Sequence, residues 1–323
     1  MPSNHTESMK DLLETESELF ALAVALAQAG HRYTCPTPLT IERVNSRPEN
    51  RWARDVAGVF GWSRSFREGV VPHAVMRAMQ AAGVLLADAD GWRSRVRAST
   101  LDGALYLHSA YPTTAPDAVF FGPDTYRYVR EIRWLLAQRT RPVRRAVDIG
   151  CGAGPGALTI ARACPDALVR ATDVNPAALL MTRVNARVAG IRNVQTQVSD
   201  LLRDVPGQYD LIVANPPYMR DMAGRAYRDG GGALGEGIAL TIARTAPQRL
   251  APGGSLLLYT GVAMVNGADA FLEAIRLQLA DSGMSWSYEE TDPDVFGEEL
   301  DTPAYAGAER IATVVLRVDA AAG

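Results

Sequence analysis

The 323-residue sequence contains little lysine or cysteine. Lys10 is the only lysine, so arginine carries the basic charge, and the base composition of the coding DNA explains this more simply than function does. Cys35, Cys151 and Cys164 are odd in number and far apart in the chain. They indicate neither a disulfide framework nor a zinc site, and they fit the reducing conditions of the cytoplasm.

Histidine is also scarce, and its positions exclude two kinds of site. The four histidines form neither a catalytic triad nor a metal-binding spacing: His5, His31, His73 and His108. We expect them to be structural or exposed, and we expect no metal site.

The sequence lacks any long apolar run and any large excess of charge. Its polar, acidic first twenty residues do not resemble a signal peptide, and the run at residues 20–30 is too short to span a bilayer. The net charge of -3 gives no overall attraction to nucleic acid or to an anionic membrane. We therefore expect a cytoplasmic protein that binds neither.

Residues 1–110 are predicted to form a separate, mainly helical domain. Helices are expected at 16–30, 51–61 and 71–83, each closed by a glycine. A hairpin should follow at 84–99, with a turn at Asp90-Gly91 and a second strand that continues to Arg97. Three helices and a hairpin outline a winged helix, which can bind DNA, support dimerisation or cover a substrate.

Residues 111–323 alternate between strands and helices, which predicts a parallel sheet. Strands are expected at 144–150, 167–174, 194–200, 209–215 and 254–261, with helices at 125–139, 155–164, 176–190, 237–250 and 268–283. The last two strands, 285–290 and 310–318, are expected to be antiparallel. The fold class is therefore α/β, with a seven-stranded Rossmann-like sheet.

A glycine-rich turn follows the first of these strands, in the segment "VDIGCGAGPGALTIA". Gly150, Gly152 and Gly154 would let the backbone approach a ligand closely. Asp148 precedes the turn, where a carboxylate would repel a pyrophosphate and could meet a cationic ligand instead.

Two further carboxylates follow the next two strands. Asp173 can accept hydrogen bonds from both ribose hydroxyls of a nucleoside, and Asp200 can accept one from the amino group of an adenine. Because the carboxyl ends of parallel strands meet at one edge, we expect both to line the crevice where open α/β sheets bind ligands.

The fourth strand ends abruptly in "NPPY", residues 215–218. Two prolines cannot continue a central strand, so the chain turns sharply there. The Asn215 amide offers an acceptor and a donor but no base, which suits a substrate amino group that must be oriented. The carbonyl of Pro216 can accept a second N–H, and the ring of Tyr218 can stack on a planar acceptor.

Taken in order, "DIGCGAGPG", "TDVN", "SD" and "NPPY" resemble the class I S-adenosylmethionine-dependent methyltransferases. "FFGPDTY" (120–126) and "YRDGGGALGEGIAL" (227–240) are similar to the branch that methylates glutamine in protein release factors. The resemblance implies S-adenosylmethionine as cofactor and a small-molecule or peptide acceptor. It assigns acceptor binding to Asn215, Pro216 and Tyr218. It assigns cofactor binding to Phe121, Thr125, Asp148, Gly150, Gly152, Gly154, Asp173, Val174, Asp200, Leu201 and Asn215. His108, shortly before this region, is a further candidate.

The acceptor stays open at this point. The winged-helix outline differs from the helical bundle expected of a release-factor enzyme, and the segment 219–226 leaves little room for a peptide-binding loop. The acidic connection 291–309 is either a lid for an amine or a solvated loop, and Trp286, Phe296 and Tyr305 either wall a pocket or pack that loop.

The leading hypothesis is methyl transfer to a nitrogen of a small molecule or a glutamine side chain, by an enzyme that could form a homodimer. Alternatives are intramolecular displacement that releases methylthioadenosine, adenine methylation in nucleic acid, and a cofactor-sensing winged-helix protein. The sensing hypothesis requires a continuous basic face around Arg77, Arg93, Arg95 and Arg97.

Overall fold

The computed structural model describes the backbone of residues 9–322 and the side chains from residue 14 onward, so His5 lies outside the described residues. The chain divides into two compact units. Unit 1 holds the described residues up to Thr113, with Phe120–Pro123 and Arg183–Arg192. Unit 2 holds Thr114–Val119, Asp124–Thr182 and the described residues from Asn193 onward. No helix within residues 9–322 is both long and apolar enough to cross a membrane.

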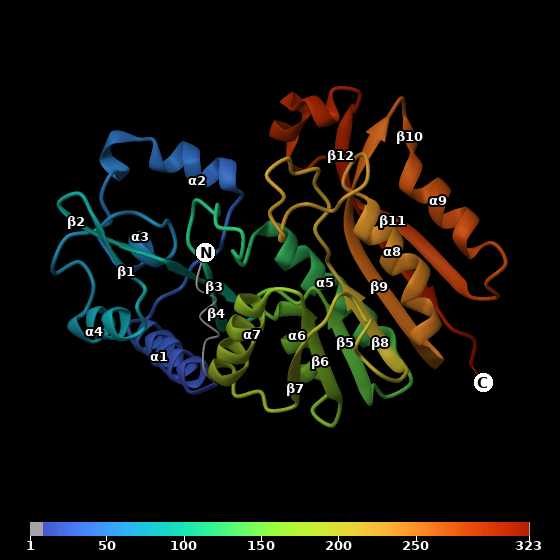
Figure 1. The fold of residues 1–323 in the computed structure, drawn as a ribbon, viewed down its shortest axis with the longest axis horizontal. Helices are drawn as coiled ribbons and strands as arrows, with labels where there is room; N and C mark the ends of the chain where they lie inside the picture. Colours follow the sequence, from blue (N-terminus) through green and yellow to red (C-terminus); the bar gives the residue numbers. More distant parts are fainter. Residues whose placement is uncertain (1–8, 323) are drawn as a thin grey trace, which may run out of the picture. The chain divides into compact units, whose positions relative to one another are not determined.

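Unit 1 consists of one long helix and several short ones, followed by two hairpins (Figure 1). The helices are α1 (Met9–Gln28), α2 (Pro38–Asn45), the 3-10 turn η1 (Pro48–Asn50), α3 (Val56–Phe60) and α4 (His73–Ala81). The helix predicted at 51–61 is only five residues long, because the Asp55 carboxylate caps it by accepting the Gly58 N–H at 2.7 Å. Helix α2 was missed, although Thr37 and Pro38 form a recognisable helix start.

The predicted hairpin is present, but two details of the prediction were wrong. Strands β1 (Leu85–Asp88) and β2 (Gly91–Ser94) pair antiparallel, and Asp88 faces Gly91, so the turn is Ala89-Asp90. Gly91 lies in the strand because its backbone passes close to the carbonyl of Phe66, where a side chain would meet it at 2.3 Å. The chain after Ser94 starts a second hairpin, β3 (Val96–Leu101) with β4 (Ala104–Ser109).

The second hairpin breaks the basic face that the sensing hypothesis requires. Arg97 lies in β3 with only 1% of its surface exposed, and its Nε donates to the carbonyl of Ser109 at 3.4 Å. Arg77 and Arg95 are exposed and Arg93 is half-buried. The continuous surface required by the sensing hypothesis is therefore not formed by these four residues.

Unit 2 contains the predicted sheet. Its helices are α5 (Pro123–Gln138), α6 (Pro155–Ala163), α7 (Pro176–Val188), α8 (Gly237–Thr245) and α9 (Ala270–Leu279), of which α5 and α7 extend into segments of unit 1. Its strands are β5 (Arg145–Ile149), β6 (Leu168–Asp173), β7 (Val194–Val198), β8 (Tyr209–Ala214), β9 (Leu250–Val265), β10 (Ala268–Asp269), β11 (Ser285–Asp292) and β12 (Arg310–Asp319). Short 3-10 turns are η2 (Pro247–Arg249), η3 (Gly297–Asp301) and η4 (Pro303–Tyr305).

The strand order is β11-β12-β9-β8-β5-β6-β7, with the short β10 paired to β9 (Figure 1). The first five strands in the sequence of unit 2, β5 to β9, are parallel, and β12 runs antiparallel to both β9 and β11. This confirms the α/β class and the seven-stranded path, and the predicted antiparallel pair. Because β5 to β9 are parallel, their carboxyl ends share one edge of the sheet.

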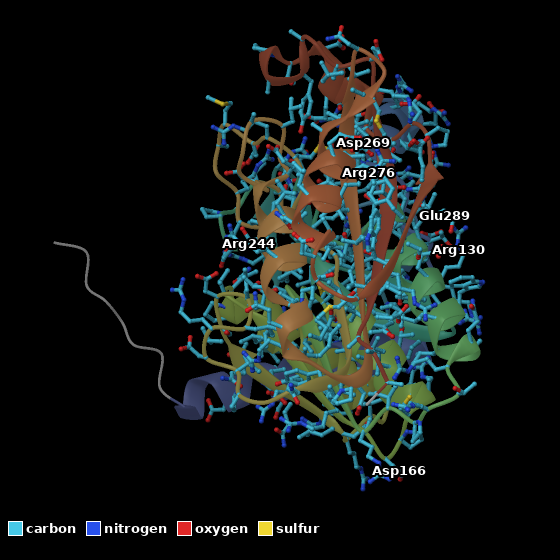
Figure 2. All side chains as sticks on the ribbon, turned by 90° about the vertical axis from the view of Figure 1, so that its right-hand side faces the viewer. Arg130, Asp166, Arg244, Asp269, Arg276 and Glu289 are labelled. Carbon is cyan, nitrogen blue, oxygen red and sulfur yellow. The ribbon has the colours of Figure 1, made fainter. Side chains whose placement is uncertain are left out.

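The core of unit 2 explains why its strands are nearly continuous apolar runs. Both faces of a mostly parallel sheet are covered, so β8 and the middle of β9 are buried almost throughout. Helices α8 and α9 contribute Ile242 and Ile275 to the core on one face (Figure 1). Helix α9 starts where Asp269 accepts the N–H of Leu272 at 2.9 Å (Figure 2). Trp286 packs against this core.

Candidate active site

Three predicted site residues leave the sheet side by side at its carboxyl edge. In the register of the central strands, the paired residues on β6, β5 and β8 are Thr172, Ile149 and Ala214. The residues that follow them in the chain are Asp173, Gly150 and Asn215. The fold therefore brings together segments that are 23 to 65 residues apart in the sequence, as the predicted strand ends required.

The glycine turn opens toward free space at two of its three glycines. Gly150 and Gly152 have φ angles of 68° and 54°, and a side chain at either would meet nothing within 4 Å. Gly154 (φ 85°) differs, since a side chain there would lie 2.9 Å from Leu158 and Thr182. Gly150 and Gly152 thus leave room for a ligand, whereas Gly154 is required for packing at the start of α6.

Asp148 is fully buried beneath this turn. Its Oδ1 accepts the hydroxyl of Tyr128 at 2.8 Å, and its Oδ2 accepts the N–H of Ala157 near the start of α6 at 2.8 Å. Burial raises the pKa of Asp148 to about 7, even though both hydrogen bonds act in the opposite direction. The carboxyl group therefore changes its protonation state near neutral pH.

Asp173 is held by the turn that it faces. One carboxylate oxygen accepts the N–H of Gly152 at 3.0 Å and the other accepts the N–H of Asn175 at 2.9 Å. Burial raises the pKa of this carboxyl as well. In the described part of the chain, neither Asp148 nor Asp173 forms an ion pair, so both carboxylates suit a cationic or hydroxyl-bearing ligand.

The other predicted cofactor residues on these strands are more accessible. Val174 is 56% exposed. Asp200 is also exposed and pairs with Arg203 at 3.0 Å. Leu201 has a positive φ of 55° and packs partly against the core. Asp200 therefore keeps an accessible carboxylate beside its ion pair, and Leu201 is only partly accessible.

Asn215 follows β8 with its side chain partly exposed, and the following Pro216 is buried. Among residues 14–322, none hydrogen-bonds the Asn215 amide. The amide therefore keeps its carbonyl and its NH2 group available for a bound molecule.

Tyr218 is fixed by a buried carboxylate that sequence reasoning missed. Its hydroxyl donates to Oδ2 of Asp124, while Oδ1 of Asp124 accepts the hydroxyl of Tyr259 at 2.9 Å and pairs with Arg127 at 3.0 Å. Arg127 also pairs with Asp292 at 2.8 Å. Asp124 lies within the recognised "FFGPDTY" segment, which was the available signal, whereas nothing in the strand pattern marked Tyr259.

The ring of Tyr218 is held as firmly as its hydroxyl. A side chain at Gly261 would lie 2.2 Å from the ring, so only glycine allows this packing. Phe296 meets the ring edge-on, with centroids 6.1 Å apart. The burial of the hydroxyl and the nearby Asp124 carboxylate raise the pKa of Tyr218 well above its usual value, so it stays a neutral donor.

The acidic connection 291–309 packs onto the segment after NPPY. The hydroxyl of Tyr305 accepts the N–H of Arg220 at 2.9 Å and donates to the carbonyl of Leu234 at 3.0 Å. Glu299 pairs with Arg228, which also approaches Asp221 at 3.7 Å. The connection is therefore not a freely solvated loop, and arginines pair with two of its carboxylates, Asp292 and Glu299.

The remaining candidates are buried. Thr125 in α5 belongs to unit 2. Phe121 and His108 belong to unit 1, where their rings stack with centroids 5.0 Å apart. Burial lowers the pKa of His108 well below its usual value, so it is neutral, and its Nε2 is 2.8 Å from the hydroxyl of Ser99. Over the described residues, no cluster of histidine, cysteine or acidic side chains suits a metal ion.

Comparisons with known proteins agree with this geometry. The family model of the methyltransferase small domain matches residues 133–264. The release factor glutamine methyltransferase of Bordetella pertussis is 37% identical over 190 residues, which cover 55% of this chain and 69% of that protein. The corresponding enzyme of Neisseria gonorrhoeae is 34% identical over 186 residues, 54% of this chain and 64% of that protein.

A third relative is the 4-amino-L-phenylalanine/4-methylamino-L-phenylalanine methyltransferase of Streptomyces pristinaespiralis. It is 32% identical over 197 residues, 56% of this chain and 66% of that protein. The chain therefore belongs to the class I S-adenosylmethionine-dependent methyltransferases of the glutamine branch and is an enzyme that uses S-adenosylmethionine as its cofactor.

Proposed function

We propose that this enzyme transfers a methyl group to a nitrogen atom, either of a glutamine side chain or of a small amine. The observation that carries the proposal is the free amide of Asn215, which leaves the sheet next to Gly150 and Asp173. An amide can accept an N–H of the acceptor without removing its proton. This orients a nitrogen lone pair without a general base, so the rate gain comes from positioning and electrostatic support.

The residues present fit the cofactor. S-adenosylmethionine supplies an electrophilic methyl on a cationic sulfonium. Asp148 and Asp173 lack cationic partners among the described residues, and Gly150 and Gly152 leave space beside them. We propose that Asp173 holds the ribose hydroxyls, that Asp200 and Leu201 contact the adenine, and that Thr125 and Val174 complete the part of the cofactor site that unit 2 supplies.

We propose that Asn215, the carbonyl of Pro216 and the ring of Tyr218 hold the acceptor. Because its hydroxyl and ring are both fixed, Tyr218 keeps the NPPY turn in one position. A turn that does not move preserves the line between the acceptor nitrogen and the methyl group, on which transfer depends.

We propose that residues 1–110 and 111–323 act as two domains, the first of them winged-helix-like. Helices α1, α3 and α4 precede the hairpin β1–β2, and an isolated antiparallel bridge joins Phe66 to Trp92 of β2. Because the arginines do not form a continuous face, we favour a substrate-covering or dimerising role over nucleic-acid binding. Three free cysteines fit the cytoplasm as its location.

Incubation with S-adenosylmethionine, followed by mass analysis, tests the reaction. The acceptors are a release factor, 4-amino-L-phenylalanine and, as the control, no acceptor. We expect S-adenosylhomocysteine together with one N-methylated acceptor. Methylthioadenosine formed without acceptor would instead establish intramolecular displacement. Methylated adenine in nucleic acid added as a further acceptor would establish adenine methylation. Either result would contradict the proposal.

A further inference from the structure

Unit 1 contains a concave pocket of about 600 Å³ that is lined only by its own residues. Three separate parts of unit 1 converge there: the turn between α2 and η1 with the residues that follow it, the loop after α3, and β2 with the loop at Tyr111. Four arginines line it: Arg47, Arg51, Arg64 and Arg93. Because the lining comes from segments far apart in the sequence, the folding of unit 1 assembles the pocket.

No ion pair among the described residues compensates the arginines of this pocket. Its lining has no aspartate or glutamate, and none of the four arginines forms an ion pair within the described residues. Two carboxylates lie close to the lining without being part of it: Asp88 accepts the hydroxyl of Ser65, and Asp55, which caps α3, acts through its charge to raise the pKa of Arg64. Residues 1–113 carry twelve basic and twelve acidic residues, so the excess of positive charge is local to this pocket.

Two of the arginines are held in place by neutral groups. Arg93 donates to the carbonyl of Tyr111 at 3.3 Å, and its buried Nε has no partner among the described residues. Arg64 donates to Oδ1 of Asn45 at 2.8 Å and lies over the ring of Trp62. Partial burial without an anionic partner costs free energy, and this cost explains why burial lowers the pKa of Arg64.

We propose that this pocket binds a small ligand that carries two or more phosphate groups. A guanidinium matches two phosphate oxygens with a planar pair of donors, and four guanidinium groups match a multiply charged pyrophosphate better than a single carboxylate. In the same lining, the hydroxyl of Ser63 accepts the N–H of Tyr111 and keeps its own proton to donate, and the amide of Asn50 keeps one N–H besides the one that it donates to the carbonyl of Val44.

A small ligand fits the pocket better than a nucleic acid does. A nucleic-acid strand follows an extended positive groove. Here four arginines line one hollow, Arg97 is buried, and the exposed Arg77 and Arg95 are not in the lining. The inference concerns unit 1 alone and does not rest on the proposed methyl acceptor.

Calorimetric titration of the full chain with inorganic pyrophosphate at low salt tests the proposal. The double variant Arg47→Gln/Arg51→Gln changes two exposed side chains that have no structural partner among the described residues, so it should fold normally. We expect it to weaken pyrophosphate binding about 100-fold, at about tenfold for each charge-assisted contact. Arg93→Gln should weaken it about tenfold or more. Cofactor binding, measured in the same samples, should not change.

The matched control is Arg95→Gln, which removes the same charge two residues from Arg93 but outside the pocket. It should leave pyrophosphate binding within about twofold of the wild type. If Arg95→Gln weakened binding equally, the affinity for pyrophosphate would depend only on the net charge of unit 1, and the proposal would be overturned. The absence of saturable pyrophosphate binding would also overturn the proposal. The proposal would also be overturned if a single-stranded oligonucleotide bound more tightly than pyrophosphate and pyrophosphate did not displace it.

Discussion

The candidate site has two sides, and the carboxylates on these sides have different hydrogen-bond and ion-pair partners. On the glycine-turn side, formed by Asp148, Gly150, Gly152 and Asp173, the carboxylates accept hydrogen bonds only from hydroxyl and backbone N–H groups. Burial raises the pKa of both carboxyls there. This side contains negative charge that no cation of the protein compensates within the described residues.

On the NPPY side, formed by residues 215–240 with Asp124 and the connection 291–309, arginines neutralise the carboxylates. Asp124 pairs with Arg127 and Glu299 pairs with Arg228. Asp221 pairs with Arg225 at 2.6 Å, and hydrogen bonds from this arginine lower the pKa of Asp221 to about 2.

The glycine-turn side therefore has carboxylates, unpaired within the described residues, that a cationic ligand can pair with, whereas Asp124, Asp221 and Glu299 of the NPPY side are already paired with arginines. A cationic cofactor supplies the positive charge that the glycine-turn side lacks, whereas the NPPY side needs only an oriented acceptor. The glycine-turn side should therefore respond to pH and to cofactor, and the NPPY side should respond to the removal of single contacts.

The largest expected effect is the pH dependence that Asp148 gives to stability. Its raised pKa means that the folded chain keeps a proton between about pH 4 and 7 that the unfolded chain has lost. The free energy of unfolding should therefore fall as pH rises through this window, by about 4 kcal/mol, since one pKa unit corresponds to about 1.4 kcal/mol. Urea denaturation of the wild type and of Asp148→Asn at each pH measures it, and the variant should lose this slope.

Asp221 should give stability the opposite pH dependence. Its lowered pKa stabilises the fold above about pH 4, and this contribution is lost as the pH falls toward 2. Asp221→Asn should therefore remove stability at neutral pH but leave the slope between pH 4 and 7 unchanged. Saturating cofactor should reduce the Asp148 slope in the wild type, because a bound cation favours the carboxylate. If Asp148→Asn and Asp221→Asn both lost the slope between pH 4 and 7, the carboxylates of the two sides would not differ in their pKa shifts.

The next largest effect is on catalysis. Asn215→Ala removes the amide that orients the acceptor, and kcat should fall about 100- to 1,000-fold, as for the loss of one preorganised hydrogen-bonding group at a reacting centre. Calorimetry should show cofactor binding within a few fold of wild type, since the glycine-turn side is intact. Asn215→Asp keeps the shape but loses the NH2 donor, and it should also be impaired. Normal turnover by Asn215→Ala would refute the acceptor assignment.

The sequence predicted this edge of the sheet well because strand ends are local features. Asp148, Asp173 and Asn215 each follow or end a buried apolar run, and parallel strands must bring such ends together. The long-range partners were not predictable in the same way. Asp124 and Tyr259 are 135 residues apart, and hydrophobic periodicity does not specify which hydroxyl meets which carboxylate.

Unit 1 shows the same limit. Helices α1 and α4 followed from composition, but the position of the turn at Ala89-Asp90 depends on the close approach of Gly91 to the backbone of Phe66, and that contact is tertiary. The charge of Arg97 suggested an exposed position, yet tertiary packing of the second hairpin buries it.

A smaller effect is expected for cofactor affinity. Asp173→Asn keeps one acceptor oxygen but removes the charge, and cofactor binding should weaken about 10- to 100-fold, in line with the loss of a hydrogen bond to a charged group. The matched control is Asp166→Asn. Asp166 is an exposed aspartate between α6 and β6, before the amino end of β6 and so at the opposite edge of the sheet (Figure 2). Equal weakening in both variants would mean that net charge, and not the position of Asp173, determines affinity.

The smallest effect distinguishes two hydroxyls that share one carboxylate. Tyr218→Phe and Tyr259→Phe each remove one hydrogen bond to Asp124, and each should lower the free energy of unfolding by about 1.5 kcal/mol. Only Tyr218 belongs to the NPPY turn, so Tyr218→Phe should also lower kcat severalfold, whereas Tyr259→Phe should change it less. Urea denaturation and initial rates measure the two quantities. If both variants lowered kcat equally, Asp124 would act through the whole framework, and the fixed position of Tyr218 would have no separate role in transfer.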